Sequence, residues 1–599
     1  MNESKYHSHK FNMVILPVIA AAGFLPLIVH MYHYDAGWES LAWFPNISNS
    51  QIDFFLGWKS IGVIILTIIM AGVLFHRYKK NEKNLLTEPA FLLLLIYGIF
   101  VLMSAIMSPY KPQVFTGSYE VLQPAEVLLG YLVICFYTYQ FSNQENQLLC
   151  ILQFSGIGLG IMLIIGFFQF IGFDLLQTTV GKALLASPGW WDKLDQITFS
   201  FPKHQVYTTL YNPDFLSFYF GLVIPILVAM FFASKRTIHK LILCIMIILS
   251  VICVIGSGAS SAYLAVAITA IAGAYLYLSR KKKTWITGNI VALISVIIVA
   301  GICMTTSLGT HVKALFVGTQ RTSEEFALKS IETTDEGIKL NIDGKILTIS
   351  YIFDAESETA TVFFTDDQGN FLSSEIIATA SGSAYSLTAE DYAACQVEPV
   401  YLDNTLCIKV SLEETDWYFT NQTDGTYYYC NPIGEFEKVA PIKKSTLFRD
   451  DAMSGRGNLW NLIIPKLPSH ILIGGGANSF ARVFPQTDYV YKVYNGLGNV
   501  FAVKAHNWFL QEWVENGLIG TLCLFAFYLW YFIKSVRIYH SCSLNSATSR
   551  IGFGIFIGTI GYMAAGVVND ANVTTAPVFW VAMGLGMAAN RMIAEKNEK

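Results

Sequence analysis

Long apolar runs recur along this chain and restrict the folds that it can adopt. They lie near residues 11–30, 54–76, 90–108, 122–141, 147–173, 209–232, 238–256, 259–278, 284–306, 506–533, 550–569 and 574–590. A helix needs about 20 consecutive, mostly apolar residues to cross the hydrocarbon core of a bilayer. The sequence therefore predicts an all-α polytopic membrane protein with about 12 transmembrane helices.

The composition indicates that a lipid bilayer is a partner of the chain. Of the 599 residues, 53% are hydrophobic and only 14% are charged, whereas soluble domains carry about 25% charged residues. The net charge of −4 is too small to indicate a nucleic-acid partner. The ten cysteines show no CxxC spacing of the metal-binding kind. Three of them, Cys395, Cys407 and Cys430, share a polar region in which one pair could form a disulfide.

Basic residues cluster in connections on one side of the predicted membrane region. These connections are residues 76–83, 234–240, 279–284, 534–540 and 591–599. The alternate connections at 31–40 and 568–575 contain neither Lys nor Arg. Because Lys and Arg are enriched on the cytoplasmic side, both termini are expected in the cytoplasm. Residues 307–505 then form one extracytoplasmic region between an N-terminal membrane region (1–306) and a C-terminal one (506–599).

The extracytoplasmic region is predicted to contain an inserted β-rich domain at about 330–435. "GIKLNIDGKILTISYIF" (337–353) alternates apolar and polar residues around an Asp-Gly turn, which is typical of a β-hairpin. Trp417 and the tyrosines at 427–429 are expected in strand cores or cross-strand pairs, with stacking on sugars as the alternative. Residues 445–505 are predicted to be partly helical, with a helix over 457–464 that the following prolines end.

The predicted outer side gathers several ionisable residues at the ends of membrane helices. They are Lys203 and His204 before one helix, Arg456 in "SGRGNLW", His506 before another helix, and Asp570 between the last two. Ionisable residues in such places are functional candidates. The alternative for a lysine is that its stem packs while its amine reaches water. The alternative for His506 is a helix cap or a hydrogen-bonded structural histidine.

Arg456 and His506 are chemically suited to a transfer reaction on a phosphate-linked substrate. A guanidinium is permanently charged and binds phosphate oxygens through two parallel hydrogen bonds. An imidazole titrates near neutrality and can take a proton from a sugar hydroxyl. Glycosyl transfer from a lipid diphosphate requires both functions. Glu512 and Glu515 lie about a third to a half of a turn from His506 around the helix, so they are expected to bond to neighbouring helices.

Three consecutive segments resemble the C-terminal signature of the O-antigen ligase and O-antigen polymerase superfamily. "SGRGNLW" (454–460), "IGGGANSF" (473–480) and "AHNWFLQEWVENGLIGTL" (505–522) match its arginine, glycine and histidine elements in the expected order. "TLYNPDFLSFYFGLVIPI" (209–226) resembles the superfamily's Asn-Pro-Asn segment, and this resemblance makes Asn212 a candidate to bind substrate. The β-rich insert lies outside the resemblance.

The resemblance implies an enzyme that takes glycans from undecaprenyl diphosphate on the outer face of a bacterial cytoplasmic membrane. It implies no cofactor, no nucleotide sugar and no metal. Arg456 would bind the diphosphate or an adjacent glycan oxygen, and His506 would be the base for the acceptor hydroxyl. Asn507 would help to shape the site, and Asp570 in the last outer loop would take part.

The chain departs from the superfamily pattern around a second phosphate-binding cation. Relatives often carry an arginine shortly before the Asn-Pro-Asn segment, where this chain has Lys203 and His204 as candidates to bind substrate. Thr208 stands in place of a glycine, and Asp214 in place of the second asparagine. Relatives also often show Ser-Arg where this chain has "GSGASSAYL" (256–264). The second cation could be Lys203, Arg321, Arg449 or Arg482.

The leading interpretation is a glycan transferase, with a polymerase slightly favoured over a ligase. A polymerase would add to another lipid-linked unit, and a ligase to a different lipid, a protein or the wall. Other envelope-polysaccharide assembly proteins could be partners of either. The alternative is a transporter or flippase of lipid-linked sugars, although transporters typically divide into similar halves and no repeat is visible here. A third interpretation is an outer-face sensor that works through the β-rich insert.

Overall fold

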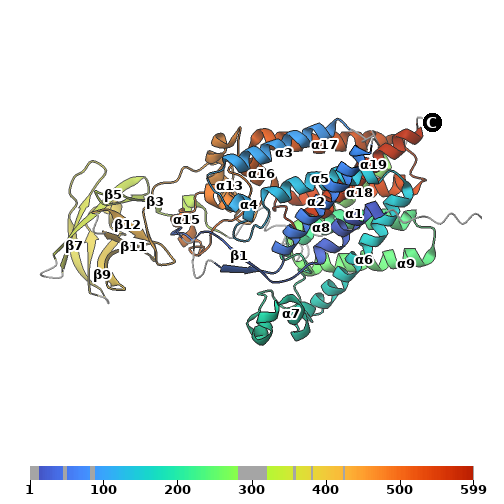
Figure 1. Cartoon of the computed structure of the whole chain (residues 1–599). Coiled ribbons are helices and arrows are strands. Elements are labelled where there is room, and N and C mark those ends of the chain that lie inside the picture. The colour runs from blue at the N-terminus through green and yellow to red at the C-terminus, as the bar shows by residue number, and fades with distance from the viewer. Residues whose placement is uncertain are drawn as a thin grey trace, which may run out of the picture.

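The computed structural model describes residues 13–38, 40–44, 50–80, 88–280, 320–354, 359–379, 382–421 and 425–597. A helical body occupies one end of the molecule, and a β-rich region extends from it at the other end (Figure 1). The N-terminal and C-terminal parts of the chain both contribute helices to the helical body. The β-rich region comes from the residues between them.

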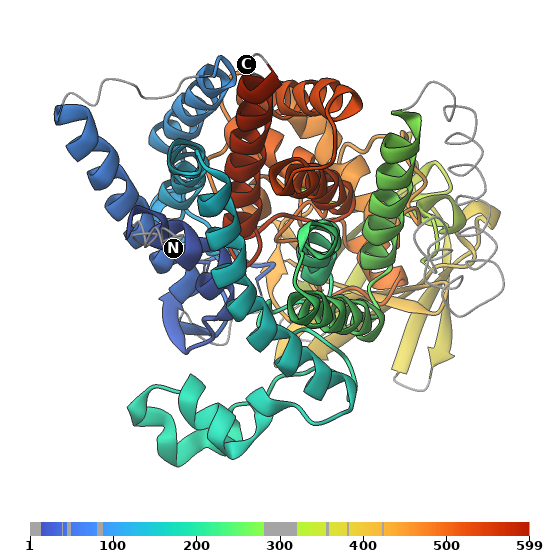
Figure 2. The same ribbon diagram turned by 90° about the vertical axis from the view of Figure 1, so that its right-hand side faces the viewer.

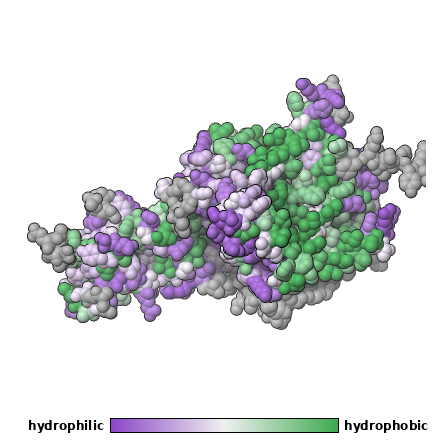
Figure 3. Space-filling model, turned by 60° about the horizontal axis from the view of Figure 1, so that its bottom comes forward, coloured by the Kyte–Doolittle hydropathy of each residue, from purple (hydrophilic) through white to green (hydrophobic). Residues whose placement is uncertain are grey.

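Seven of the described helices are long and apolar enough to cross a membrane. They are α2 (Gly57–Lys79), α3 (Ala90–Met107), α6 (Glu145–Phe170), α8 (Phe215–Ala233), α9 (Thr237–Ser257), α10 (Ser260–Ser279) and α17 (Leu518–Ser541). Large apolar side chains such as Ile68, Leu92 and Ile164 stay exposed on them. Hydrophobic residues cover much of the helical body in Figure 3, whereas the β-rich region is more polar. The chain is therefore a polytopic membrane protein that carries a β-rich domain.

The five other predicted spans do not appear among these seven helices. The first run is a short, broken helix over Met13–Leu27, and α5 (Ala125–Phe141) is also shorter than 18 residues. The last two runs form α18 (Ala547–Gly566) and α19 (Ala576–Asn597), which are not among the seven. The run at 284–306 lies outside the described residues. The number of about 12 spans therefore stays a prediction.

Burial inside the bundle explains why α19 can carry polar groups. The Asn590 side chain donates a hydrogen bond to Ser535 Oγ of α17 at 2.8 Å. The Arg591 guanidinium lies 4.4 Å from the ring centroid of Tyr139 in α5. Both residues are buried, and polar groups buried in a membrane protein need such partners. A helix surrounded by other helices therefore needs less apolar surface than one that faces lipid.

Glycines bring α8 and α18 into close contact near the centre of the bundle (Figure 2). A Cβ at Gly558 would lie 2.3 Å from the carbonyl oxygen of Leu222, and one at Gly554 would lie 2.7 Å from that of Pro225. Only glycine allows this approach of two backbones. The contact fixes the start of α8 at Phe215 relative to the loop that follows α18.

The basic connections meet at the end of the bundle opposite to the start of α8. Arg280, at the end of α10, donates to the carbonyl oxygen of Cys542 after α17. Arg550 of α18 donates to the carbonyl oxygen of Phe232 in the last turn of α8. Lys534 of α17 pairs with Glu88, which precedes α3, at 2.5 Å. Three cations at the ends of α10, α17 and α18 therefore lie at one face of the helical body.

Two antiparallel sheets share one core in the β-rich region. The four-stranded sheet has the order β3-β4-β5-β6, and the seven-stranded sheet has the order β13-β12-β11-β10-β9-β8-β7. The strands are β3 (Leu328–Thr333), β4 (Ile338–Ile342), β5 (Lys345–Asp354), β6 (Thr359–Thr365), β7 (Ser374–Thr379), β8 (Gly382–Leu387), β9 (Gln396–Leu402), β10 (Thr405–Leu412), β11 (Thr415–Asn421), β12 (Tyr427–Cys430) and β13 (Phe436–Glu437). The predicted hairpin is confirmed, because Ile342 pairs with Lys345 across the Asp-Gly turn.

Burial decides how the aromatic residues of this region are used. Trp417, Tyr427 and Tyr429 are almost fully buried in the shared core, so these three are core residues and cannot stack on sugars. Cys395 and Cys407 are buried and Cys430 is partly buried, and all three are free thiols. Tyr489 and Tyr491 of α15 (Tyr489–Tyr494) also enter this core, which ties the β-rich region to the segment that leads back to the membrane.

The segment that returns to the membrane differs from its prediction at two prolines and one glycine. The predicted helix at 457–464 is present as α13 (Arg456–Ile463), but the chain continues through Pro465 and Pro468 as a 3₁₀ helix, η9 (Ile464–His470). The predicted span at 506–533 is split into α16 (Trp508–Asn516) and α17. Gly517, with a φ of 80°, separates the two helices, and such a φ favours glycine.

Candidate functional site

A cavity of about 470 Å³ lies between the starts of α8, α10 and α13 and the residues before α16. We call it the Arg–His cavity. Its lining residues are Asp214, Gly258, Ala259, Ser260, Ser261, Gln320, Ser454, Gly455, Arg456, Leu459, Leu497 and His506. The structure thus brings Arg456 and His506 together, although 50 positions separate them in the sequence. They lie at the end of α8 that is remote from the basic connections.

Arg456 is the first residue of α13 and is held from three sides. Gly455 before it has a φ of 85°, which turns the chain into the helix. The guanidinium donates from Nη1 to the Met453 carbonyl at 3.1 Å and from Nη2 to Asn569 Oδ1 at 3.2 Å. Nη2 also lies 3.8 Å from Asp214 Oδ2, and the side chain is only 16% exposed. The Nε atom is buried without a hydrogen-bond partner among the described residues.

His506 is oriented by the buried carboxylate of Asp570. Asp570 Oδ2 accepts the backbone N–H of His506 at 3.1 Å and lies 3.3 Å from its Nδ1. The imidazole is 46% exposed, whereas the Asp570 side chain is 5% exposed. A carboxylate on Nδ1 favours the tautomer that leaves the Nε2 lone pair free. The φ of His506 is 47°, an uncommon conformation that bonded surroundings must hold.

Asn507 supports the position of His506. Its Oδ1 accepts the backbone N–H of Leu510 at 2.9 Å and so caps the N-terminus of α16. Its Nδ2 donates to the Val567 carbonyl at 2.9 Å, and its backbone N–H donates to Asp570 at 3.2 Å. With both ends of its amide bonded inside the protein, Asn507 positions its neighbours and does not line the cavity.

A second cavity, of about 690 Å³, adjoins the first and shares Asp214, Gly258 and Ala259 with it. We call it the acidic cavity. Its lining residues are Tyr34, Gln51, Ile52, Asp53, Phe54, Phe55, Leu56, Tyr119, Glu120, Thr198, Phe199, Ser200, Phe201, Gln205, Tyr211, Asn212, Pro213, Asp214, Ser257, Gly258 and Ala259. Part of its wall is a short hairpin of β1 (Tyr32–Asp35) and β2 (Ser50–Asp53), which the sequence did not predict.

The acidic cavity offers hydrogen-bond acceptors and aromatic faces. Glu120 Oε1 accepts the hydroxyl of Tyr211 at 3.1 Å. Burial raises the pKa of the Asp53 carboxyl, whose Oδ2 accepts the backbone N–H groups of Leu56 and Gly57. Within the described ranges, no Lys or Arg lines the cavity. Carboxylates repel phosphate and accept from hydroxyls, so this cavity suits a neutral, hydroxyl-rich ligand.

Asn212 lines the acidic cavity, and its neighbour Asp214 connects the two cavities. Asn212 Oδ1 accepts the backbone N–H of Asp214 at 2.9 Å. Ser261 of α10 donates to Asp214 Oδ1 at 3.4 Å. The segment that stands where the superfamily has Asn-Pro-Asn therefore lies directly beside Arg456.

Lys203 and His204 are not brought to either cavity. Both residues are exposed, and neither lines the Arg–His cavity or the acidic cavity. The His204 ring is bonded through Nδ1 to the Phe170 carbonyl oxygen at 3.0 Å. Lys203 and His204 come just before α8 in the sequence but lie away from the cavities at its start. The chain turns between them and α8 at Thr208 and Tyr211, which both have positive φ.

The other candidates for a second cation have partners elsewhere. Arg449 pairs with Asp451 at 3.0 Å, Arg321 lies 3.9 Å from Glu325, and the Arg482 guanidinium lies 5.5 Å from the ring centroid of Tyr110. None of the three lines either cavity.

Lys504 is a cation near the site that the sequence analysis did not single out. It is buried, and its Nζ lies 5.4 Å from the ring centroid of Phe215, the first residue of α8. It lies two residues before His506 in the sequence, and the ring that its Nζ faces directly follows Asp214.

Glu512 and Glu515 lie behind the site in α16, ahead of the spanning helix α17. Glu512 accepts the hydroxyl of Tyr97 in α3 at 2.8 Å, which confirms a bond to a neighbouring helix. It also accepts from Trp508 at 3.0 Å. Burial raises the pKa of both carboxyls, to about 8 for Glu515. These glutamates anchor α16, and neither lines the Arg–His cavity.

Asn569 is the residue of the site that sequence reasoning missed. Its Oδ1 accepts from Arg456 and its Nδ2 donates to Ser217 of α8 at 3.3 Å. Its carbonyl accepts the backbone N–H of Trp508 at 2.9 Å. The only signal was its position next to Asp570.

No family model matches this chain, and no curated protein matches it.

Proposed function

We propose that this protein transfers a glycan from an undecaprenyl-diphosphate carrier to an acceptor hydroxyl. The observation that carries the proposal is the convergence of Arg456 and His506 on one cavity, with the Asp570 carboxylate behind the imidazole. A fixed guanidinium and an oriented base are the two groups that this transfer needs at one place. The resemblance of the surrounding segments to O-antigen ligases and polymerases adds the identity of the carrier.

In this proposal the acceptor oxygen attacks the anomeric carbon of the carrier-linked sugar. The acceptor O–H proton moves to Nε2 of His506, and Asp570 stabilises the imidazolium that forms. The bond between the anomeric carbon and the diphosphate oxygen breaks, and the electron pair leaves with the diphosphate. Arg456 binds that diphosphate and offsets the added negative charge. The released undecaprenyl diphosphate is the second product.

The acidic cavity is the proposed place for the sugars next to the reacting bond. It opens from the Arg–His cavity at Asp214, so a glycan could extend into it while the diphosphate stays with Arg456. Its carboxylates, phenols and rings suit sugar hydroxyls and apolar sugar faces. The charge difference between the cavities would give the substrate one orientation.

The distribution of cations supports an outer-face site in the cytoplasmic membrane of a bacterium. α8 begins beside Asp214 and Arg456 and ends next to Lys235 and Arg236. Because Lys and Arg are enriched in cytoplasmic connections, the proposal puts Lys235 inside, the site outside, and both termini in the cytoplasm.

The proposal is tested with purified protein and lipid-linked repeat units. Incubation with these units alone should give a ladder of longer lipid-linked products, as expected for the favoured polymerase. Transfer that appears only after a second lipid, protein or wall acceptor is added would identify a ligase. No transfer in either mixture, from protein that elutes as one folded species, would contradict the proposed function.

Replacing Asp214 by asparagine should improve binding of the diphosphate. The substitution removes a carboxylate that lies 3.8 Å from Arg456 and keeps a side chain that can accept from Ser261. Removing one like charge near the phosphates should lower the donor KM about fivefold, which corresponds to about 1 kcal/mol. Steady-state kinetics with varied donor would measure it. Asp195→Asn, on an exposed 3₁₀ helix (η5, Pro188–Gln196), is the matched control, and an unchanged KM for Asp214→Asn would contradict the prediction.

Deleting residues 330–435 should leave part of the transfer activity. The β-rich region has its own core, and Leu497 of the Arg–His cavity lining packs against that core from outside the deleted segment. Acceptor choice should change, since a neighbouring surface is lost. Tyr489 and Tyr491 would be uncovered, so they should be changed to serine in the same variant. Complete loss of transfer in a well-folded deletion variant would favour the sensor interpretation.

A further inference from the structure

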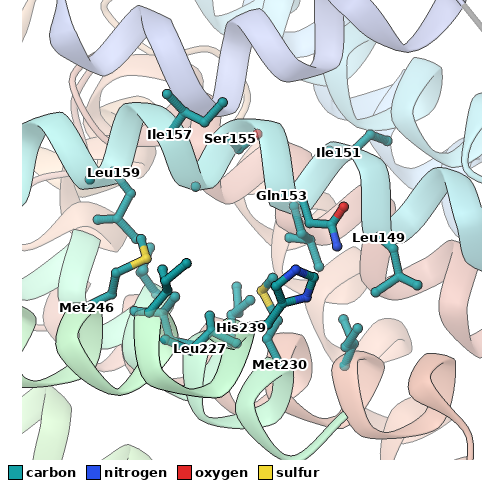
Figure 4. A pocket seen from close by; sticks show the side chains of 18 of the residues that line it. Leu149, Ile151, Gln153, Ser155, Ile157, Leu159, Leu227, Met230, His239 and Met246 are labelled. Atoms are coloured by element: carbon teal, nitrogen blue, oxygen red, sulfur yellow. The ribbon is translucent and has the colours of Figure 1, made fainter. Parts of the chain in front are cut away.

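A third cavity, of about 870 Å³, lies among α6, α8 and α9 and reaches α19 (Figure 4). We call it the lipid groove. Its walls are mostly apolar, with residues such as Leu159, Leu227 and Met246 (Figure 4). Gly156 and Gly160 of α6 also line it, and a Cβ at either position would have no neighbour within 4 Å. The groove therefore has open space along α6 that no side chain fills.

One end of the lipid groove is basic. Lys235, Arg236 and His239 line it there, between the end of α8 and the first turn of α9. Lys235 and Arg236 are exposed, and the described part of the chain offers neither of them a carboxylate partner. The His239 ring lies at the same end as the Gln153 amide (Figure 4). The cluster thus combines two unpaired cations with two further hydrogen-bonding groups.

The lipid groove has the length of a lipid chain. Its lining on α8 runs from Tyr219 to Ala233, which corresponds to about 21 Å at 1.5 Å per helical residue. One leaflet contributes about 15 Å to a hydrocarbon core of about 30 Å. An acyl chain that starts at the basic end can therefore lie fully inside the groove.

We infer that the lipid groove binds an anionic phospholipid of the leaflet at its basic end. The phosphate contacts Lys235, Arg236 and His239, and one acyl chain lies along Gly156 and Gly160. Basic pockets between membrane helices are suited to anionic headgroups, and an apolar slot alone would not select among lipids. The basic end of the groove lies at the other end of α8 from Arg456, and the groove shares no lining residue with the Arg–His cavity, so this inference does not depend on the proposed function.

Binding of a defined phospholipid to the purified full-length protein tests the headgroup contact. Delipidated protein in detergent is titrated with phosphatidylglycerol or with zwitterionic phosphatidylcholine, and bound lipid is counted by native mass spectrometry. Wild-type protein should retain phosphatidylglycerol in preference. The Lys235→Gln and Arg236→Gln double variant should lose at least about fivefold in affinity for it. Lys240→Gln, one turn further along α9 and outside the groove lining, should bind as wild type does.

A second variant tests the chain contact without changing any charge. Gly160→Phe fills open space and should weaken binding of both phospholipids, whereas Gly72→Phe of α2, also in open space but outside the groove, should not. Equal binding of both phospholipids by wild-type protein, or unchanged phosphatidylglycerol binding in the double variant, would overturn the inference. A third result would also overturn the inference: Gly160→Phe abolishes a dimer of the protein but leaves lipid binding unchanged. A second copy of the chain would then be what covers the groove.

Discussion

Replacing His506 by alanine is expected to lower the rate of glycan transfer by about 10²–10⁴-fold, the usual contribution of a general base. The imidazole lines the Arg–His cavity and has the Asp570 carboxylate at its Nδ1. Without it the acceptor proton must go to water. The amount of protein in the membrane should not change, because the His506 ring is 46% exposed and, among the described residues, its polar contact is the one to Asp570.

The measurement is initial-rate transfer by purified protein with saturating lipid-linked donor. His506→Asn is a useful second variant, because asparagine tolerates the positive φ of this position and cannot act as a base. Asp570→Asn should lower the rate less severely, since it leaves the imidazole in place but loses its charged partner. His204→Ala, at an exposed histidine that lines neither cavity, should transfer at the native rate. A native rate for His506→Ala would refute the catalytic assignment.

Replacing Arg456 by alanine is expected to lower the transfer rate by about 10²–10³-fold, as for other groups that stabilise developing negative charge. The guanidinium is the cation that lines the Arg–His cavity. Its loss would leave Asp214 without its ion pair and Asn569 without a donor. The diphosphate would then leave towards a carboxylate with no compensating charge.

Arg456→Lys separates charge from geometry. A lysine restores the charge but cannot make two parallel hydrogen bonds to phosphate oxygens, so its rate should lie between those of wild type and Arg456→Ala. Arg449→Ala is the matched control, because this guanidinium lies in the same outer segment and pairs with Asp451 at the surface. If Arg456→Ala and Arg449→Ala had equal rates, Arg456 would have no special role. Thermal unfolding in detergent would show whether either variant is destabilised.

Much of the fold follows from periodicity, because long apolar runs and alternating strands are local signals. The seven membrane-length helices, the Asp-Gly hairpin and α13 are all visible in this way. The predicted continuous helix after His506 was wrong at Gly517, since one glycine in an apolar context does not reveal its φ. The short β1–β2 hairpin was missed, because its eight residues carry little apolar alternation.

The candidate site could be predicted only as a set of residues on one side of the membrane. Topology gives the side of each helix end, but neither its place around the bundle nor its distance from the others. Arg456, His506 and Asp570 come together, whereas Lys203 and His204 share their side and stay apart from them. The role of Asn569 depends on three long-range contacts, and no local pattern encodes such contacts.

The backbone contact between Gly558 and Leu222 has a consequence for how a bulky donor could enter. It ties together the two helices whose outer ends carry Asp214 and the Asn569 loop, so these two groups form the stationary side of the site. The Arg–His cavity is also lined by Ser454, Leu459 and Leu497. These three residues belong to the outer segment between the β-rich region and α16. We expect admission and release of the isoprenoid substrate to depend on displacement of that outer segment, with α8 and α18 unmoved relative to each other.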